Sequence, residues 1–119
     1  MENFTFTPED NSFIIEADGK KLRISYAEFY GNYEDAMKFC KENGGGDETV
    51  ENLRFIARYR DAINAELNEL GKDRIEGWYW SNEPSWRYND GSFVVNPRSG
   101  SVINEYRNSN SNARAVSAL

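Results

Sequence analysis

The sequence predicts an α+β domain, because three kinds of segment follow one another along its 119 residues. A strand–turn–strand pattern comes first, two segments with helical periodicity follow, and short strand-like pieces between turn residues fill the remainder. A chain of this length suffices for one domain and is too short for two ordinary ones. We therefore expect a single domain over residues 1–119, with residues 1–11 as a candidate extended arm.

The opening pattern predicts a β-hairpin. The apolar run FII precedes Asp18-Gly19, a dipeptide that favours the primed turns of two-residue hairpins. Leu22 and Ile24 then alternate with polar residues, which places both on the buried face. A ligand-binding loop at DGKK is the alternative, and the plain turn is the better interpretation.

The first helix is expected to begin after Asn32, a residue that caps helix N-termini well. The segment NGGG at 43–46 ends it, since these residues tolerate left-handed backbone conformations. Four side chains recur at the spacing of one helix face, namely Tyr33, Ala36, Met37 and Cys40. This pattern makes Cys40 a buried, small hydrophobic side chain rather than a reactive thiol, and a single cysteine excludes an internal disulfide.

A second helix is expected to begin near Asp47 or Thr49 and to end at Gly71. Its apolar stripe comprises Val50, Leu53, Ile56, Ala57, Ile63, Leu67 and Leu70. Arg60 falls on the same stripe, and its long side chain can cover the edge of the helix.

From residue 77 onward the sequence predicts short strands at GWYWS, SFVV, SVINEY and ARAV, with turns at NP and SG between them. Trp78 and Trp80 lie two apart, so they share one face of their strand and Tyr79 occupies the other. At least one of the two tryptophans belongs to the core. Trp86, beyond Pro84, is a surface candidate. We further expect one common core that buries Leu53, Ile56, Trp80 and Val116 together.

Composition narrows the classes of function. The chain has no histidine, which removes the usual proton shuttle and the commonest metal ligand. Its net charge is −6, and no segment concentrates Lys or Arg, so a nucleic-acid partner is not expected. Apolar runs are short, so we expect no membrane insertion. The start MENFTFTPED has neither a basic nor an apolar stretch and does not read as a signal peptide.

The order of these segments resembles the C-type-lectin-like fold over residues 20–117. The matching pieces are YEDAMKFC in the first helix, LRFIARYRDAINAEL in the second, YWSN, NPRSGSV and the closing ARAV. The likeness is to the bacterial branch at the C-termini of Legionella collagen-like adhesins and in the variable proteins of diversity-generating retroelements. It implies a twisted, mainly antiparallel sheet with long loops, and it places the YWSN strand in the central sheet. One departure is GGGDETV, where the family often has an arginine-leucine-proline turn.

The resemblance also raises calcium binding and catalysis. Sugar-binding relatives hold calcium with a Glu-Pro-Asn triplet and a distant Trp-Asn-Asp, whereas here Glu83-Pro84-Ser85 and Asn89-Asp90 nearly abut. We expect a turn and no metal, with calcium on Glu83, Asn89 and Asp90 as the open alternative. Formylglycine-generating enzymes, which resemble this fold, use two cysteines. With one cysteine and no placed pair of carboxylates, we expect neither an enzyme nor a cofactor.

The most informative feature is the Asn- and Ser-rich segment 81–112, in which these two residue types fill 14 of 32 positions. Antibody paratopes combine such side chains with Tyr and Trp. The candidate ligand-binding residues are Trp86, Arg87, Tyr88, Asn89, Tyr106, Arg107, Asn108 and Asn110. Trp86, Tyr88, Tyr106 and Arg107 are expected to share one exposed face.

We therefore expect a non-catalytic recognition module that binds a protein or glycan ligand through its C-terminal loops. The alternative is a structural or assembly domain of a phage virion or bacterial surface protein, with no specific ligand. The resemblance suggests a bacterial cell surface or a phage particle as the setting.

Overall fold

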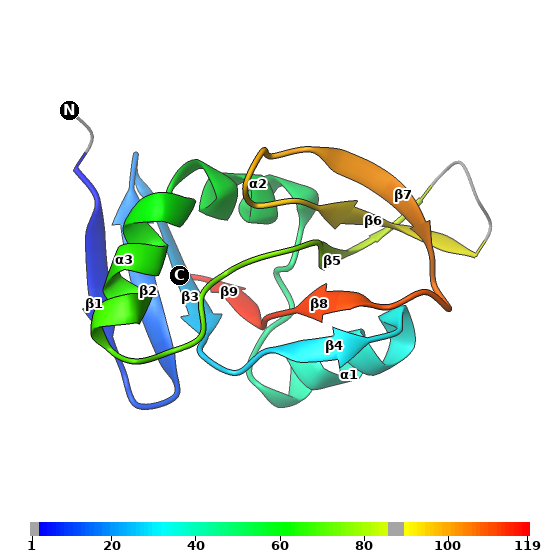
Figure 1. The fold of residues 1–119 in the computed structure, drawn as a ribbon, viewed down its shortest axis with the longest axis horizontal. Coiled ribbons are helices and arrows are strands. Elements are labelled where there is room, and N and C mark those ends of the chain that lie inside the picture. Colours follow the sequence, from blue (N-terminus) through cyan, green and yellow to red (C-terminus); the bar gives the residue numbers. More distant parts are fainter. Residues whose placement is uncertain (1–2, 86–89) are drawn as a thin grey trace.

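The computed structural model of the chain describes residues 3–85 and 90–119. Over these residues it is α+β, with three helices and two mainly antiparallel sheets, as the sequence predicts. The first sheet has the strand order β1-β2-β3-β9 and the second has the order β4-β8-β5-β6-β7. Figure 1 shows the two sheets side by side along the long axis of the molecule.

The predicted hairpin lies in the first sheet. The strands of this sheet are β1 (Thr5–Pro8), β2 (Ser12–Ala17), β3 (Lys20–Ser25) and β9 (Val116–Ala118). Between β2 and β3, Asp18 has φ 51° and Gly19 has φ 73°, the positive values that a primed turn requires. Leu22 and Ile24 are buried, which confirms the predicted face of β3.

Part of the candidate N-terminal arm belongs to the same sheet. Strand β1 runs antiparallel to β2, with Phe6 opposite Ile15. The Phe6 ring also stacks on the ring of Phe13, with 4.8 Å between the centroids. Residues 5–8 are therefore tied down by backbone pairing and by an aromatic contact.

The first helix, α1 (Tyr33–Glu42), has the predicted caps. The Asn32 Oδ1 accepts a hydrogen bond from the backbone N–H of Asp35 at 2.9 Å, which satisfies one of the free amides of the first turn. The helix ends at Asn43, and Gly44 follows with φ 81°. Cys40 is buried on the inner face, as expected.

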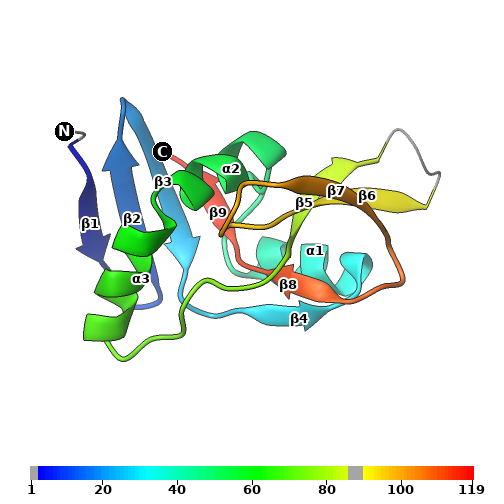
Figure 2. The same ribbon diagram turned by 45° about the horizontal axis from the view of Figure 1, so that its top comes forward.

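The prediction of one continuous second helix is wrong. The chain forms α2 (Val50–Arg58) and α3 (Arg60–Glu69), with a break at Tyr59, where φ is −108° and ψ is 14°. The Tyr59 ring lies 5.3 Å from that of Phe4, and its hydroxyl donates to Asp18 at 3.2 Å. These long-range contacts accompany the change of direction that lays α3 over the first sheet (Figures 1 and 2).

Two residues of the predicted apolar stripe, Leu70 and Ala57, are less buried than expected, whereas Arg60 lies as predicted. Leu70, expected in the stripe, is the C-cap residue that follows α3 and is 42% exposed. Arg60 covers the helix edge as proposed, and its Nε donates to the carbonyl of Ile75 at 3.1 Å. Ala57 is only half-buried.

The second sheet carries the C-terminal half of the chain. Its strands are β4 (Phe29–Gly31), β5 (Tyr79–Pro84), β6 (Gly91–Val95), β7 (Val102–Tyr106) and β8 (Ser111–Ala113). Strand β5 lies in the middle, antiparallel to β6 and parallel to β8. The expected closing strand ARAV is instead divided: β8 ends at Ala113 and β9 begins at Val116, so the chain passes from one sheet to the other at Arg114 and Ala115.

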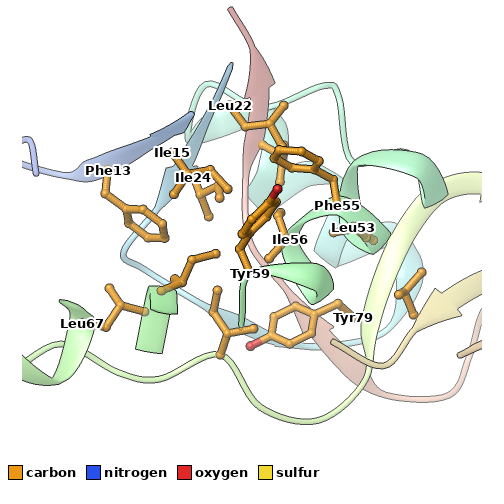
Figure 3. Packing of buried hydrophobic residues seen from close by; sticks show 14 of the residues in the cluster. Phe13, Ile15, Leu22, Ile24, Leu53, Phe55, Ile56, Tyr59, Leu67 and Tyr79 are labelled. Atoms are coloured by element: carbon orange, nitrogen blue, oxygen red, sulfur yellow. The ribbon is translucent and has the colours of Figure 1, made fainter. Parts of the chain in front are cut away.

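The buried hydrophobic residues that the structure describes form two clusters, so the expectation of one common core is wrong. Leu53, Ile56 and Val116 belong to the first cluster, between the first sheet and α2–α3. Figure 3 shows the side chains of this cluster converging from β2, β3, α2, α3 and β5. Trp80 belongs to the second cluster, with Cys40 and Val94. Because Trp80 and Tyr79 point to opposite faces of β5, Tyr79 is the residue that reaches the first cluster.

Arg114 lies where the two sheets meet, and its side chain is 2% exposed. Its Nε donates to Glu28 Oε1 at 2.9 Å, and its Nη2 donates to the carbonyl of Asp73 at 2.9 Å. The hydroxyl of Tyr79 donates to the same Glu28 oxygen. Burial raises the pKa of Tyr79 well above its usual range, so the phenol keeps its proton.

Candidate functional site

A groove of about 560 Å³ lies where α1 begins and β7 ends. We call it the α1–β7 groove, and its lining residues are Asn32, Tyr33, Glu34, Met37, Arg107 and Asn108. A volume of several hundred Å³ is typical of ligand sites. Two of the residues predicted for ligand binding, Arg107 and Asn108, therefore lie in a hollow surface beside the start of a helix.

The backbone of Arg107 ties three elements together at this place. Tyr106, the last residue of β7, pairs with Gly91 in β6. The N–H of Arg107 donates to the carbonyl of Asp90 at 2.8 Å, and its carbonyl accepts from the N–H of Tyr33 at 3.0 Å. The entrance to β6, the end of β7 and the first residue of α1 are thereby fixed to one another.

The side chain of Arg107 is equally fixed. Its guanidinium carbon lies 4.8 Å from the ring centroid of Tyr33, a cation–π contact. Its Nε donates to the carbonyl of Gly91 at 3.2 Å and to Ser92 Oγ at 3.1 Å. Arg107 is half-buried rather than exposed. It lines the groove while its guanidinium group stays in contact with the Tyr33 ring.

Tyr33 connects the groove to the second core cluster. Its ring meets that of Trp80 edge-on, with 5.6 Å between the centroids, and its hydroxyl lies 3.5 Å from the carbonyl of Asn82. The indole N–H of Trp80 donates to the carbonyl of Gly31 at 2.9 Å. The groove thus rests on packed aromatic side chains, which is the kind of support that holds binding residues in one geometry.

Three further candidate residues are described and exposed, and we call Tyr106, Asn108 and Asn110 the rim; of these, Asn108 also lines the groove. Tyr106 is 50% exposed, and Asn108 and Asn110 are exposed beyond it. A turn holds them, in which the N–H of Ser109 donates to the carbonyl of Tyr106 at 3.0 Å. Tyr106, Asn108 and Asn110 therefore offer an aromatic side chain and two amides at the end of the second sheet.

The other four predicted residues, Trp86, Arg87, Tyr88 and Asn89, lie outside the described residues. The residues on either side of them are described, and both contact the β7 region. Ser85 Oγ donates to Asn104 Oδ1 in β7, and the Asp90 carbonyl accepts from Arg107. The sharing of one face by Trp86, Tyr88, Tyr106 and Arg107 stays a prediction.

Sequence reasoning missed four lining residues of the groove. Tyr33 and Met37 were assigned to the buried face of the first helix, yet both are only partly buried. Asn32 is predicted as a helix cap and not as a binding residue, and the sequence pattern assigns no role to Glu34. Their position at the start of the predicted helix is the feature that could have indicated a role in the site. Side chains in the first turn of a helix lie next to whatever segment packs on its N-terminus.

Glu83, one of the three residues considered for calcium binding, has another role in the structure. Its Oε2 accepts a hydrogen bond from the N–H of Val50 at 2.6 Å, which caps the start of α2. Within residues 3–85 and 90–119, no group of three or more Asp, Glu, Cys or His side chains could hold a metal ion. Asn89 is outside this range, so metal independence stays a prediction.

Cys40 has the surroundings of a structural residue. Its Sγ lies 3.5 Å from the carbonyl of Arg114 in the second core cluster. Burial raises the pKa of its thiol to about 12, with a smaller contribution from the nearby Glu48. The side chain is thus a neutral thiol at physiological pH, which makes it a poor nucleophile.

Comparisons with protein-family models, with curated proteins and with solved structures yield no match to this chain. Over the described ranges, none of the helices combines the length and the apolar character needed to cross a membrane.

Proposed function

We propose that this chain is a non-catalytic recognition module, which binds a protein or glycan ligand through the α1–β7 groove and the loops around it. The observation that carries the proposal is that side chains held in place by the fold lie beside exposed side chains that can adjust to a ligand. Tyr33 and Arg107 are held by the fold, whereas Tyr106, Asn108 and Asn110 are exposed. Stiff aromatic area beside adaptable amides is the composition of known recognition surfaces.

Binding fits this site better than catalysis does. Among the described lining residues Glu34 is the one carboxylate, and it is exposed on the first turn of α1. Acid–base or nucleophilic chemistry needs at least two groups placed against each other, such as a nucleophile and its base. Amides, an aromatic ring and a guanidinium engaged with that ring are instead suited to hydrogen bonding and stacking.

We further propose that the fold is of the C-type-lectin-like kind, close to the bacterial adhesin and retroelement-variable branch. Two features support this. The YWSN segment lies in β5, the middle strand of the second sheet. The NPRSGS turn has its glycine, Gly100, at φ 76° between two paired strands. On this proposal the chain acts at a bacterial surface or on a phage particle, and nucleic acid is not its partner.

A structural or assembly role is the second candidate, and one observation favours it. Strand β7 forms an edge of the second sheet, and two of its large side chains, Ile103 and Tyr106, are exposed. An edge strand with exposed apolar side chains can pair with another chain. In that case the C-terminal half would bind one constant partner chain in an assembly, rather than a ligand that varies.

The proposal is tested by comparing two variants with the unmodified chain on glycan and bacterial surface-protein arrays. The rim variant carries Tyr106→Ser, Asn108→Ala and Asn110→Ala. The control variant carries Asn68→Ala, Glu69→Ala and Leu70→Ser, three exposed positions at the end of α3. Since interface energy concentrates in a few residues, we expect the rim variant to bind at least about tenfold more weakly, and the control variant to bind normally.

Two results would contradict the recognition role. The rim variant might bind every recovered ligand as tightly as the unmodified chain does, with both variants folded. Alternatively, no ligand would be recovered while the chain self-associates through β7, which would support the assembly role.

A further inference from the structure

A second groove, of about 740 Å³, lies on α2 and shares no lining residue with the α1–β7 groove. Three segments far apart in the sequence form it: the β2–β3 hairpin turn, the exposed side of α2 and the β6–β7 turn. We call it the α2 groove. Its lining residues are Asp18, Lys20, Val50, Glu51, Arg54, Phe55, Ala57, Arg58, Arg98, Ser99 and Gly100.

The α2 groove gathers positive charge in a chain whose net charge is −6. Four of its side chains are cationic and two are anionic. Lys20 Nζ lies 3.8 Å from Glu51 Oε2, and Arg58 Nη1 lies 3.3 Å from Asp18 Oδ2. These two pairs use both carboxylates, and Arg54 and Arg98 are the cations that remain.

Arg54 and Arg98 have no carboxylate partner in the part of the chain that the structure describes. The ion pairs found there involve other arginines and lysines. Arg54 projects from α2 and Arg98 from the β6–β7 turn, and both are exposed. Two elements that line one groove, α2 and the β6–β7 turn, therefore each present a guanidinium group without a carboxylate partner among the described residues.

The walls that carry these arginines are well supported. In the β6–β7 turn, Asn96 Oδ1 accepts from the N–H of Arg98 at 2.9 Å, and the Asn96 carbonyl accepts from the N–H of Gly100 at 2.7 Å. On the other side, Lys20 Nζ lies 5.5 Å from the ring centroid of Phe55, whose side chain is buried. A site whose backbone is already fixed loses less conformational entropy when a ligand binds.

We propose that the α2 groove binds an acidic peptide segment, with ligand carboxylates on Arg54 and Arg98. A guanidinium group matches a carboxylate in geometry and donates two parallel hydrogen bonds to it. The volume of the groove accommodates a segment of several residues. Ser99 Oγ donates to Ser101 Oγ at 2.9 Å and accepts from the Ser101 N–H at 3.3 Å, and its remaining lone pair can accept from a peptide N–H.

The mixed charge of the groove favours a peptide over other anions. Nucleic acid or a densely sulfated glycan would place further negative groups against Asp18 and Glu51, which lie in the same groove. A peptide alternates carboxylates with N–H donors, and the remaining lone pairs of Asp18 and Glu51 can accept from those donors. The Phe55 ring is buried, so the face that a sugar ring would stack on is covered.

This inference is independent of the proposed recognition role, because it concerns different residues. Its test uses a short fluorescein-labelled peptide of alternating glycine and glutamate, together with the counterpart in which glutamine replaces glutamate. Binding is followed by fluorescence anisotropy at low and at physiological salt. Unlabelled heparin oligosaccharide and single-stranded DNA serve as competitors.

Two variants locate the binding. The groove variant carries Arg54→Gln and Arg98→Gln, and the control variant carries Lys38→Gln and Lys41→Gln, two exposed positions on α1 outside both grooves. Both variants change the net charge of the chain equally. We expect the acidic peptide to bind the groove variant at least about tenfold more weakly, since two charge-assisted contacts are lost. We expect near-normal binding to the control variant, and weak or no binding of the glutamine peptide.

Three outcomes would overturn the proposal. The glutamate and glutamine peptides might bind equally, or not at all, at low salt. The control variant might lose as much affinity as the groove variant, which would indicate general attraction to positive charge. Heparin or DNA might bind tighter than the peptide in an Arg54- and Arg98-dependent way, which would assign the groove to a polyanion instead.

Discussion

The guanidinium carbon of Arg107 lies 4.8 Å from the ring centre of Tyr33, and the Arg107 carbonyl accepts a hydrogen bond from the Tyr33 N–H at 3.0 Å. These two contacts join the segment after β7 to the first residue of α1. The wall of the α1–β7 groove is therefore also a joint of the fold, and substitutions there act on stability as well as on binding.

The first prediction concerns this joint. Replacing Arg107 by Ala removes the cation–π contact and the hydrogen bonds to Gly91 and Ser92, so the free energy of unfolding should fall by about 1–3 kcal/mol. Arg107→Lys keeps the charge but loses the planar guanidinium group, so its free energy of unfolding should lie between those of the unmodified chain and Arg107→Ala. Urea titration measures the effect, with Lys38→Ala as an exposed control. An Arg107→Ala loss within about 0.5 kcal/mol would contradict the account.

The second prediction concerns Trp80. Truncation to Ala should cost about 3–5 kcal/mol, because the indole is buried and donates a hydrogen bond to the carbonyl of Gly31. Denaturant titration of the purified variant measures this loss. A loss below about 1 kcal/mol would show that Trp80 is not a core residue.

The third prediction tests the separation of the core into two clusters. Val94→Ala acts in the second cluster and Ile56→Val in the first, so their effects on the free energy of unfolding should add within about 0.5 kcal/mol. The two single variants and the double variant form the cycle. A coupling above about 1 kcal/mol would instead indicate one continuous core.

The fourth prediction concerns the ion pair between the buried Arg114 and Glu28, whose side chain is partly exposed. Arg114→Ala leaves the Glu28 carboxylate without its cation and frees the carbonyl of Asp73. Because the Glu28 side chain is partly exposed, water can solvate its charge in part, and we expect a loss of about 2–4 kcal/mol. Tyr79→Phe removes a hydroxyl that donates to Glu28 and accepts from the N–H of Glu76, and it should cost about 1 kcal/mol. Thermal or urea unfolding checks both values. Equal losses for the two variants would argue against a dominant role for the guanidinium group.

The fifth prediction concerns pH. Glu48 is 2% exposed, and burial raises its pKa above the ordinary value of 4.5. The folded state thus holds this proton more tightly than the unfolded chain does. The resulting stabilisation is fully present below pH 4.5 and is lost as the pH rises through the folded pKa.

Glu48→Gln isolates this contribution. The backbone N–H groups of Val116 and Gly46 both donate to Oε2 of Glu48, at 2.7 and 2.9 Å, and one amide oxygen can take the place of this acceptor. Stability measured from mildly acidic to neutral pH should decline less in the variant than in the unmodified chain. Parallel profiles for the two proteins would contradict a raised pKa.

The features that the sequence predicted correctly are those that local rules decide. Asp18-Gly19 requires positive φ, and Asn32 caps a helix with its own side chain, so neighbouring residues suffice for both. The opposite faces of Trp80 and Tyr79 follow in the same way from the two-residue period of a strand.

The features that the sequence did not predict depend on distant partners. The break at Tyr59 coincides with contacts to Phe4 and Asp18, which periodicity within the helix cannot indicate. The division of ARAV coincides with Arg114, which is buried and whose partner Glu28 lies far away in the chain. In the same way, no segment of the sequence concentrates Lys or Arg, yet folding brings four such residues to the α2 groove.

The candidate site was predicted only in part for the same reason. Tyr106, Asn108 and Asn110 could be chosen by residue type and loop context, and all three are exposed. The contribution of Tyr33 could not, because the helical stripe alone assigns it to the core. The hydrogen bond from its backbone N–H to Arg107 and the cation–π contact between the two side chains show that the start of α1 and the end of β7 form one surface.

The most direct test of the recognition role is to map the binding surface with two-dimensional amide NMR spectra of the unmodified chain. The ligand is the tightest binder recovered from the glycan and surface-protein arrays. The account predicts that the largest shifts fall on residues 32–37 and 106–110, around the α1–β7 groove, and that they saturate together. Shifts confined to the first sheet or to α3, with residues 32–37 and 106–110 unchanged, would contradict it.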